Sequence, residues 1–285
     1  MKTPYYRALG AAALILSTAM IVPVAAAQAV PSFTAPDSAL DRLVDECLET
    51  EGVNILKGSD VICYNAAIFP EQFLQLADMP PASKIIITSP GGNVATARIM
   101  SGILDKRGEP GVIAGQCMSA CAMVLLPGLD SVHIHRSAHI SVHGVTMMDY
   151  RTWWGWLKND AKPSQTNFIM AQWGYDMGFT MHNSGRTQMK AHLKGQNVDE
   201  AYIQTISDNM ETAAKAYTCR VDPKDYWGML DAAYITKYLG DRITGMEAFA
   251  QNWKDPNNKV YKDITKPIAD KVYIFKNDYE DANCP

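Results

Sequence analysis

The sequence predicts an α/β fold built on a largely parallel sheet. Three observations support this prediction: short β-branched runs recur, helical stretches separate them, and a tight glycine turn follows one of them. Lys84–Thr88 is the clearest strand, Asn93–Arg107 is the clearest helix, and Ser89–Gly92 is the turn between them. Alternation of strand and helix along a chain is typical of parallel strands joined by helical crossovers.

The other expected elements continue this alternation. A strand at Val61–Ala67 precedes a short helix at Pro70–Asp78, whose first residue is a proline, as is common in a first helical turn. Later elements are expected as follows: strand Gly111–Ala114, helix Met118–Leu126, strands Val132–His135 and His139–Val142, a mostly helical region 147–220, helix Asp231–Leu239, and a strand at Asp241–Ile243.

Composition and charge exclude several classes of protein. With 47% hydrophobic and 20% charged residues, the chain has the composition of a globular protein rather than a disordered one. The 26 basic residues do not outnumber the 30 acidic ones. No excess of positive charge therefore indicates a nucleic-acid partner, and we expect none. We also expect no cofactor and no bound metal.

Residues 1–29 have the layout of a secretory signal peptide. Two basic residues, an apolar stretch and a cluster of small residues follow one another, with cleavage expected after Ala27 or Ala29. The alternative is an uncleaved anchor, because residues 9–29 are just long enough to cross a bilayer. Cleavage would leave 24 basic against 30 acidic residues. We interpret the protein as exported, either periplasmic or secreted.

All six cysteines lie in the expected mature chain, where an oxidising compartment permits disulfides. They are Cys47, Cys63, Cys117, Cys121, Cys219 and Cys284. The favoured pair is Cys47 with Cys63, which flank a turn-like EGVN stretch, and closing a loop of that size would contribute about 3 kcal/mol. A bridge between Cys219 and Cys284 would hold the C-terminal tail, but spacing leaves the connectivity open.

Residues with catalytic potential gather where two expected neighbouring strands end. Ser119 lies at a strand-to-helix transition after Gly115, where a serine hydroxyl is exposed beside the first N–H groups of a helix. The Gly91–Gly92 turn offers further N–H groups. His143 follows Ser119 by 24 residues and could act as a base. A serine at a helix start is usually only a cap, so the combination carries the hypothesis.

Together these segments resemble the ClpP-type serine peptidases of the ClpP/crotonase superfamily. The resemblance rests on ITSPGGNVATA, GQCMSACAMVLLPG and RSAHISVHG. It covers about residues 61–145 well and 222–243 more loosely. It implies a ClpP/crotonase-type layered domain over 30–252, a helical insertion at about 147–220 and a C-terminal tail at 253–285. Exported relatives with this arrangement include the signal-peptide-peptidase group.

The resemblance also implies roles for individual residues. Ser119 matches the nucleophile and His143 the general base, while Gly91, Gly92 and the N–H of Ala120 match the oxyanion hole. The acid of the triad is matched by Asp225, which precedes an aromatic residue by two positions. Asp222 is the alternative candidate for this role. Asp225 could also be a solvent-exposed residue at a helix start with no part in catalysis.

Two groups of residues depart from the cytosolic peptidases. Cys117 and Cys121 bracket Ser119, and they could be small buried residues, a bridge that rigidifies the turn, or a redox switch. Three histidines, His133, His135 and His139, could be drawn with these cysteines as a zinc site. The spacing contains no CxxC-type motif, and strand alternation favours a structural or solvent-facing role for the histidines.

The long interval between His143 and Asp225 holds many aromatic and methionine side chains. It could be a lid, a membrane-contacting surface, a helical oligomer interface or plain core packing. The resemblance implies a homo-oligomer and a peptide or protein substrate. A catalytically silent module that binds peptide or protein is the first alternative function. An acyl-CoA enzyme of the crotonase branch is the second, and export argues against it because CoA substrates are cytosolic.

Overall fold

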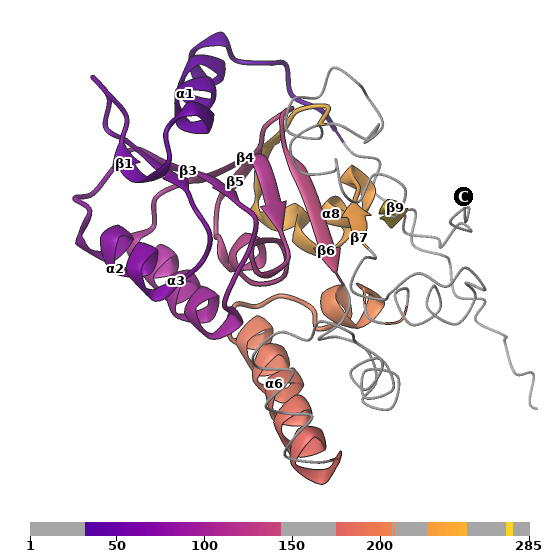
Figure 1. Cartoon of the computed structure of the whole chain (residues 1–285). Helices are drawn as coiled ribbons and strands as arrows, with labels where there is room; N and C mark the ends of the chain where they lie inside the picture. Colours follow the sequence, from indigo (N-terminus) through magenta and orange to yellow (C-terminus); the bar gives the residue numbers. More distant parts are fainter. Residues whose placement is uncertain (1–31, 144–174, 207, 209–226, 250–271, 276–285) are drawn as a thin grey trace, which may run out of the picture.

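Among the described residues, nine strands form one mixed sheet (Figure 1). The computed structural model describes residues 32–143, 175–206, 208, 227–249 and 272–275. Seven strands follow the order β1-β2-β3-β4-β6-β7-β9, and β5 and β8 branch from β4. The strands are β1 (Gly52–Ile55), β2 (Val61–Asn65), β3 (Lys84–Ser89), β4 (Gly111–Met118), β5 (Val132–Ile134), β6 (His139–His143), β7 (Trp227–Leu230), β8 (Ile243–Met246) and β9 (Val272–Phe275).

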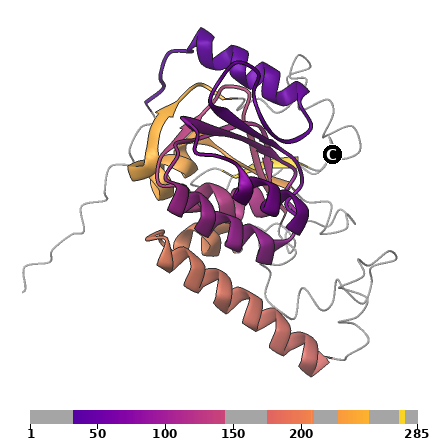
Figure 2. The ribbon, with the colours of Figure 1, turned by 90° about the vertical axis from the view of Figure 1, so that its left-hand side faces the viewer.

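Helices cover both faces of this sheet, so the predicted α/β fold is confirmed. Figure 2 shows α1 over one face and α2 and α3 over the other. The helices are α1 (Ser38–Glu49), α2 (Pro70–Asp78), α3 (Val94–Arg107), α6 (Tyr175–Gly195) and α8 (Ala232–Leu239), with a π-helical turn η1 (Cys121–Leu125) and 3-10 turns η2 (Leu126–Gly128) and η4 (Gly240–Arg242). Strands β1 and β7 run antiparallel to β2 and β6, and the other pairs are parallel.

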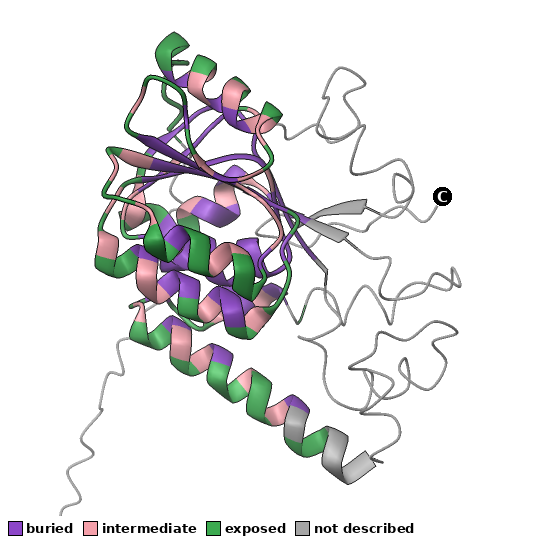
Figure 3. Cartoon of the chain, turned by 60° about the vertical axis from the view of Figure 1, so that its left-hand side comes forward, coloured by how far each residue is buried: buried purple, intermediate pink, exposed green. Residues whose placement is uncertain are grey.

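Alternating side chains of the central strands build a separate core on each face. Ile85 and Ile87 of β3 belong to the larger cluster, which also holds apolar residues of α2, α3, η1 and α8. Ile86 lies between them in the sequence and packs in a smaller cluster with Leu40 and Val44 of α1. Both faces of β3 are therefore buried, as Figure 3 shows for the central strands and as a parallel sheet requires.

The N-terminal part of the sheet differs from the expectation. The EGVN stretch, expected as a turn, lies largely in strand β1, which pairs with β2. Helix α1 precedes it and is absent from the sequence-based expectation. Leu40, Val44 and Cys47 of this helix follow the spacing of one helical face and are buried, and Asp37 caps the helix by accepting the N–H of Ala39 at 2.9 Å.

The predicted bridge between Cys47 and Cys63 is confirmed. It joins α1 to β2 with a Cα–Cα separation of 5.4 Å, and both residues are fully buried. Asn65 reinforces the junction, because its side-chain amide donates to the carbonyl of Cys47 at 3.1 Å. Helix α1 is therefore held on its face of the sheet by a covalent bond as well as by apolar packing.

Strand β4 is longer than expected because it contains a bulge. The expected strand ends before Gly115, whereas β4 continues to Met118. Gly115 takes a left-handed conformation (φ 56°), and β4 then changes neighbour, so that its first half pairs with β5 and its second half with β6. The Gly115 N–H donates to Ser137 Oγ and the Gln116 N–H to Thr88 Oγ1, both at 3.1 Å. The sheet branches at this point.

The remaining expected elements are close to those observed. Helix α2 has the predicted bounds, and α8 begins one residue later than expected because Asp231 is its N-cap and accepts the N–H of Tyr234 at 2.8 Å. The expected strand at 241–243 is instead the turn η4, and β8 begins at Ile243. Helix formation after Met118 starts one turn later, beyond Ser119.

The described parts of the expected insertion are mostly helical. Helix α6 and a helical stretch at 201–206 lie within 147–220, and residues 144–174, 207 and 209–220 lie outside the described structure. Arg98 of α3 donates to Gln188 of α6 at 2.6 Å. None of the described helices combines the length and apolar character needed to cross a membrane. Of the expected tail, Val272–Phe275 forms β9, which joins the sheet beside β7.

Burial of His139 on β6 predicts a pH-dependent stability. The side chain is 1% exposed, and desolvation lowers its pKa to about 4 from an ordinary value of 6.5. Between these values the unfolded chain binds a proton that the folded chain does not, so stability falls as the pH falls. The variant His139→Gln should remove about 1–3 kcal/mol of the stability loss between pH 7 and pH 4.

Urea unfolding of both proteins across this pH range measures the difference. Above pH 7 the His139 side chain is neutral in the folded and in the unfolded chain, and the two stability curves should run parallel there. Curves that run parallel down to pH 4 would contradict the lowered pKa.

Candidate active site

Ser119 lies immediately after β4 in a conformation that few side chains adopt. Its φ is 52°, and among the described residues only Asn197 shares such a positive value without being glycine. The Ser119 N–H donates to the carbonyl of Ser141 on β6, and its own carbonyl accepts from Met123 in η1, both at 2.9 Å. A strained serine between a strand and a helical turn is the geometry of a nucleophile elbow.

The Gly91–Gly92 turn packs directly against this serine. A Cβ placed on Gly91 would lie 2.5 Å from the carbonyl of Met118, 2.7 Å from Ser119 Cβ and 3.1 Å from the nitrogen of Ala120. Its φ of 92° also favours glycine. Only a residue without a side chain therefore lets the turn after β3 reach the turn after β4, as the sequence hypothesis requires.

The N–H groups of this turn are not equivalent. The Gly91 N–H donates to Ser89 Oγ at 3.1 Å. Ile68 bonds the flanking groups, because its N–H donates to the Gly91 carbonyl at 2.8 Å and its carbonyl accepts from Asn93 at 2.9 Å. Gly92 itself forms an isolated parallel bridge with Ile68, and in such a bridge the flanking residues make the hydrogen bonds while the N–H of the bridging residue points away from its partner. This arrangement favours Gly92 over Gly91 as an oxyanion donor.

Ala120 supplies the second expected donor. It precedes η1, so its N–H belongs to the first turn of the helical segment and has no carbonyl within that segment to bond. Gly91 and Ala120 lie side by side, because a Cβ on Gly91 would come within 3.1 Å of the Ala120 nitrogen. The turn after β3 therefore lies against the first N–H of the helical segment, which is the arrangement that an oxyanion hole between these two turns requires.

The expected base is placed by its strand alone, and the expected acid lies outside the described residues. His143 is the last residue of β6, two positions beyond Ser141, which pairs with Met118. Its side chain lies outside the described part of the structure, as do Asp225 and Asp222. The register of β6 with β7 sets His143 opposite Trp227, and Asp225 precedes Trp227 by two residues. The described strands thus bring the backbone of His143 to the same end of the sheet as Ser119.

Cys117 and Cys121 form a disulfide that brackets Ser119. Their Cα atoms are 5.1 Å apart and both residues are fully buried. Of the alternatives open from sequence, the structure contains the bridge and not two buried thiols. The zinc site drawn with these cysteines is excluded for this state, because disulfide sulfurs are not thiolate ligands. Cys219 and Cys284 lie outside the described residues.

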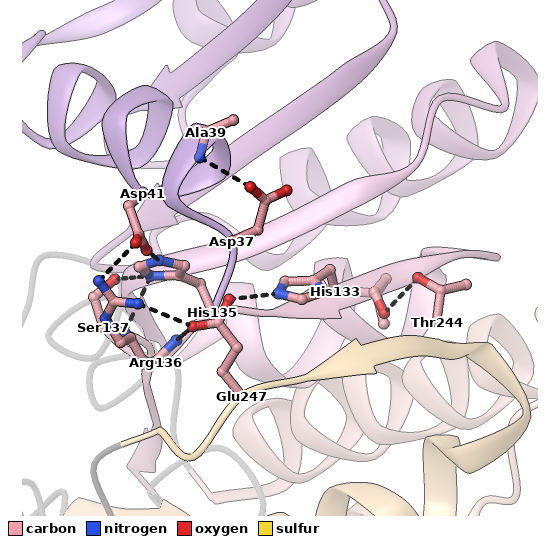
Figure 4. A network of polar contacts seen from close by, with 10 residues as sticks. Asp37, Ala39, Asp41, His133, His135, Arg136, Ser137, Thr244 and Glu247 are labelled. Atoms are coloured by element: carbon pink, nitrogen blue, oxygen red, sulfur yellow. Dashed lines mark hydrogen bonds and ion pairs between the residues drawn. The ribbon is translucent and has the colours of Figure 1, made fainter. Parts of the chain in front are cut away.

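A polar network on the α1 face connects to the bulge in β4 (Figure 4). Asp41 of α1 contacts His135 Nε2 at 2.9 Å, and Ser137 Oγ lies 2.8 Å from His135 Nδ1 and accepts the Gly115 N–H. The hydrogen bond from His135, with a contribution from Arg136, holds the pKa of Asp41 below its ordinary value.

Glu247, just after β8, completes this network. It is 1% exposed and accepts from His133 Nε2 at 3.0 Å. Arg136 lies between the two carboxylates, with a nitrogen 2.8 Å from Asp41 and another 3.7 Å from Glu247. The histidines stand out in the sequence, but their acidic partners do not. Asp41 and Glu247 are 94 and 112 residues from His135 and carry no motif, so no local signal indicates them.

Comparisons with known proteins extend over part of the chain. No protein-family model matches the sequence, and no curated protein matches it. A protein provisionally assigned as an enoyl-CoA hydratase/isomerase from Novosphingobium aromaticivorans DSM 12444 is 13% identical, with a TM-score of 0.27, over 35% of this chain and 49% of that one. An enoyl-CoA hydratase from Bacillus anthracis is 12% identical, with a TM-score of 0.24, over 33% and 55% of the two chains.

A third similar structure is an enoyl-CoA hydratase from Mycobacterium avium subsp. paratuberculosis K-10. It is 12% identical, with a TM-score of 0.25, over 34% of this chain and 50% of that one. The chain thus spans about half the length of the structures it matches. These names concern the crotonase branch of the superfamily that the motifs resemble. Matches with such low TM-scores decide no function.

The contact between Gly91 and Ser119 predicts a selective effect of one methyl group. The variant Gly91→Ala should destabilise the fold by more than about 2 kcal/mol, because its Cβ meets backbone atoms and its φ is left-handed. Gly102→Ala in α3 is the matched control, since a Cβ added there would have no atom within 4 Å. The control should gain about 0.5–1 kcal/mol from helix propensity. Equal stabilities of the two variants in chemical unfolding would contradict the packing described.

The two disulfides should differ in what they control. Chain entropy assigns about 3 kcal/mol to Cys47–Cys63, with a separation of 16, and about 2 kcal/mol to Cys117–Cys121, with a separation of 4. Replacing the first pair by alanines should therefore cost more stability. Replacing the second pair should slow the reaction of Ser119 with a serine-directed probe, because that bridge flanks Ser119. Unchanged labelling in the second variant would show that the bridge does not position the serine.

Proposed function

We propose that this chain is an exported serine peptidase that cleaves peptides or proteins through an acyl-enzyme on Ser119. The observation that supports it most is the conformation of this residue. Ser119 takes a left-handed φ between β4 and η1, with Gly91 packed against it. Strain of this kind persists where surrounding contacts enforce it, and a sharp turn between a strand and a helical segment is the setting in which a nucleophilic serine is commonly held.

In the proposed reaction, the Ser119 hydroxyl attacks the scissile carbonyl while His143 accepts its proton. The N–H groups of Ala120 and Gly92 hold the resulting oxyanion. His143 then gives its proton to the leaving amine, which departs and leaves the acyl group on Ser119. Water next attacks this acyl-enzyme while His143 accepts a proton from the water, and His143 returns that proton to Ser119 as the acid product is released. Asp225 would fix the imidazole tautomer and stabilise the charged ring.

Two disulfides among the described cysteines support the proposed export. Both Cys47–Cys63 and Cys117–Cys121 are closed. Structural disulfides persist in oxidising compartments and are rare in the cytosol. The expected signal peptide at residues 1–29 would deliver the chain there. A cytosolic acyl-CoA substrate fits this location poorly, which favours the peptidase over an acyl-CoA enzyme.

Covalent labelling tests the nucleophile. A fluorophosphonate probe should label the protein at Ser119, and Ser119→Ala should abolish both labelling and peptide hydrolysis while the thermal midpoint changes little. Ser59→Ala is the matched control, because this half-buried serine bonds only locally, in the turn between β1 and β2, and lies outside the site. The control should label and hydrolyse like the unmodified chain. Peptide mapping by mass spectrometry locates the label.

The alternative function predicts a different outcome. A catalytically silent module would not react with the probe at any pH from 5 to 9, yet would bind unlabelled peptide with an affinity that Ser119→Ala leaves unchanged. Hydrolysis that survives in Ser119→Ala would instead assign the activity to another residue.

A further inference from the structure

We propose that Tyr202 is a positioning residue for the peptidase reaction, which holds the Ala120 N–H in place as an oxyanion donor. The inference rests on the proposed function, in which that N–H binds the oxyanion. Tyr202 lies in the helical stretch at 201–206, within the expected insertion, and is fully buried. Its hydroxyl donates to the carbonyl of Ala122 in η1 at 2.6 Å, although the two residues are 80 positions apart. The insertion therefore contacts the helical turn that directly follows Ser119.

The carbonyl of Ala122 depends on this donor because the π-helical pattern of η1 supplies none. In a π-helical turn an N–H bonds the carbonyl five positions earlier, and Leu126 donates to Cys121 in this way. The next donor in the pattern, for Ala122, would be Pro127, which has no N–H. A buried carbonyl without a donor is costly. The Tyr202 hydroxyl therefore completes a hydrogen bond that the pattern of η1 leaves open.

Two peptide groups connect Ala122 to Ala120. The carbonyl of Ala122 and the N–H of Met123 belong to one planar peptide group, and this N–H donates to the carbonyl of Ser119 at 2.9 Å. The carbonyl of Ser119 in turn shares a peptide group with the N–H of Ala120. No peptide bond among the described residues is cis, so the C=O and N–H of each group point in opposite directions. A chain of hydrogen bonds therefore leads from Tyr202 to the oxyanion.

This chain has two physical consequences for the oxyanion donor. Each hydrogen bond restricts the plane of the next peptide group, so the direction of the Ala120 N–H depends on the Tyr202 hydroxyl. Each bond also polarises the next one, which strengthens the last donor. Burial raises the pKa of Tyr202, so the hydroxyl stays protonated and remains a donor. Both effects favour the transition state over the bound substrate, so loss of the hydroxyl should lower kcat rather than raise KM.

Helix α8 holds Tyr202 from its other side and also provides a control. Tyr234 of this helix donates its hydroxyl to the Tyr202 carbonyl, and the two ring centroids are 5.7 Å apart. The Tyr238 ring lies 5.9 Å from that of Tyr202, but its hydroxyl lies 2.8 Å from Thr205 Oγ1. Tyr238 thus belongs to the same group of rings, and its hydroxyl bonds within this group of elements rather than to η1.

Steady-state kinetics of three proteins test the proposal: the unmodified chain, Tyr202→Phe and the matched control Tyr238→Phe. Each variant loses one hydroxyl and keeps its ring. Peptide hydrolysis is measured well below every thermal midpoint, so that all three proteins are folded. Tyr202→Phe should lower kcat about tenfold with KM nearly unchanged, and Tyr238→Phe should change neither. Equal kcat values in the three proteins, or a fall in both variants that follows their thermal midpoints, would overturn the proposal.

The amide resonance of Ala120 provides a measurement that needs no activity. Its NMR chemical shifts should change in Tyr202→Phe and stay constant in Tyr238→Phe, and unchanged shifts in both would overturn the proposal. If the unmodified chain neither hydrolyses peptide nor reacts with the probe at Ser119, the proposed function fails, and the Ala120 shifts still decide whether Tyr202 positions this N–H. If Tyr202→Phe does not fold, Tyr234→Phe replaces it with the same expected results, because it releases the Tyr202 carbonyl from α8.

Discussion

The conformation of β4 is the constraint on which the rest of the structure depends. This strand contains Gly115 in a left-handed conformation and is followed at once by Ser119 in another. The Gly115 φ of 56° disfavours any residue with a side chain, and a Cβ there would also lie 2.5 Å from Leu48 Cδ2 and 2.7 Å from Thr88 Oγ1. The resulting bulge lets β4 serve two neighbours on one side, β5 and then β6. Without this change of neighbour, β6 could not pair with the residues directly before Ser119.

The candidate site follows from that branching. Because the second half of β4 pairs with β6, the Ser119 N–H reaches Ser141, and His143 comes to the same end of the sheet. Because β3 ends beside β4, the glycine turn after β3 packs on Ser119. Three strand ends therefore supply the proposed nucleophile, donors and base. Parallel strands commonly gather functional residues at their carboxyl ends for this reason.

Local sequence patterns predict the helices and strands whose formation depends mainly on residues adjacent in the sequence. The helix at Pro70–Asp78 and the strand at Lys84–Thr88 follow from a proline start and a β-branched run, and both are observed, the strand extended by one residue. The continuation of β4 beyond Gly115 is not predicted, because a glycine signals either a turn or a bulge and only the neighbouring strands decide between them. The same limit applies to the cluster around Glu247, whose members meet only after the sheet has formed. The positions of Asp225 and of the His143 side chain remain predictions.

The two faces of the sheet are coupled through the same bulge. On one face, η1 and the Cys117–Cys121 bridge hold Ser119 within an apolar core. On the other, the Gly115 N–H is bonded by Ser137, whose hydroxyl also contacts His135 in the polar cluster. Ser119 follows Gly115 by four positions. A shift of the cluster would alter the bulge, and a shift of the bulge would alter the pairing of β4 with β6. The polar cluster is therefore linked through the bulge to the strand that positions Ser119, without touching Ser119 itself.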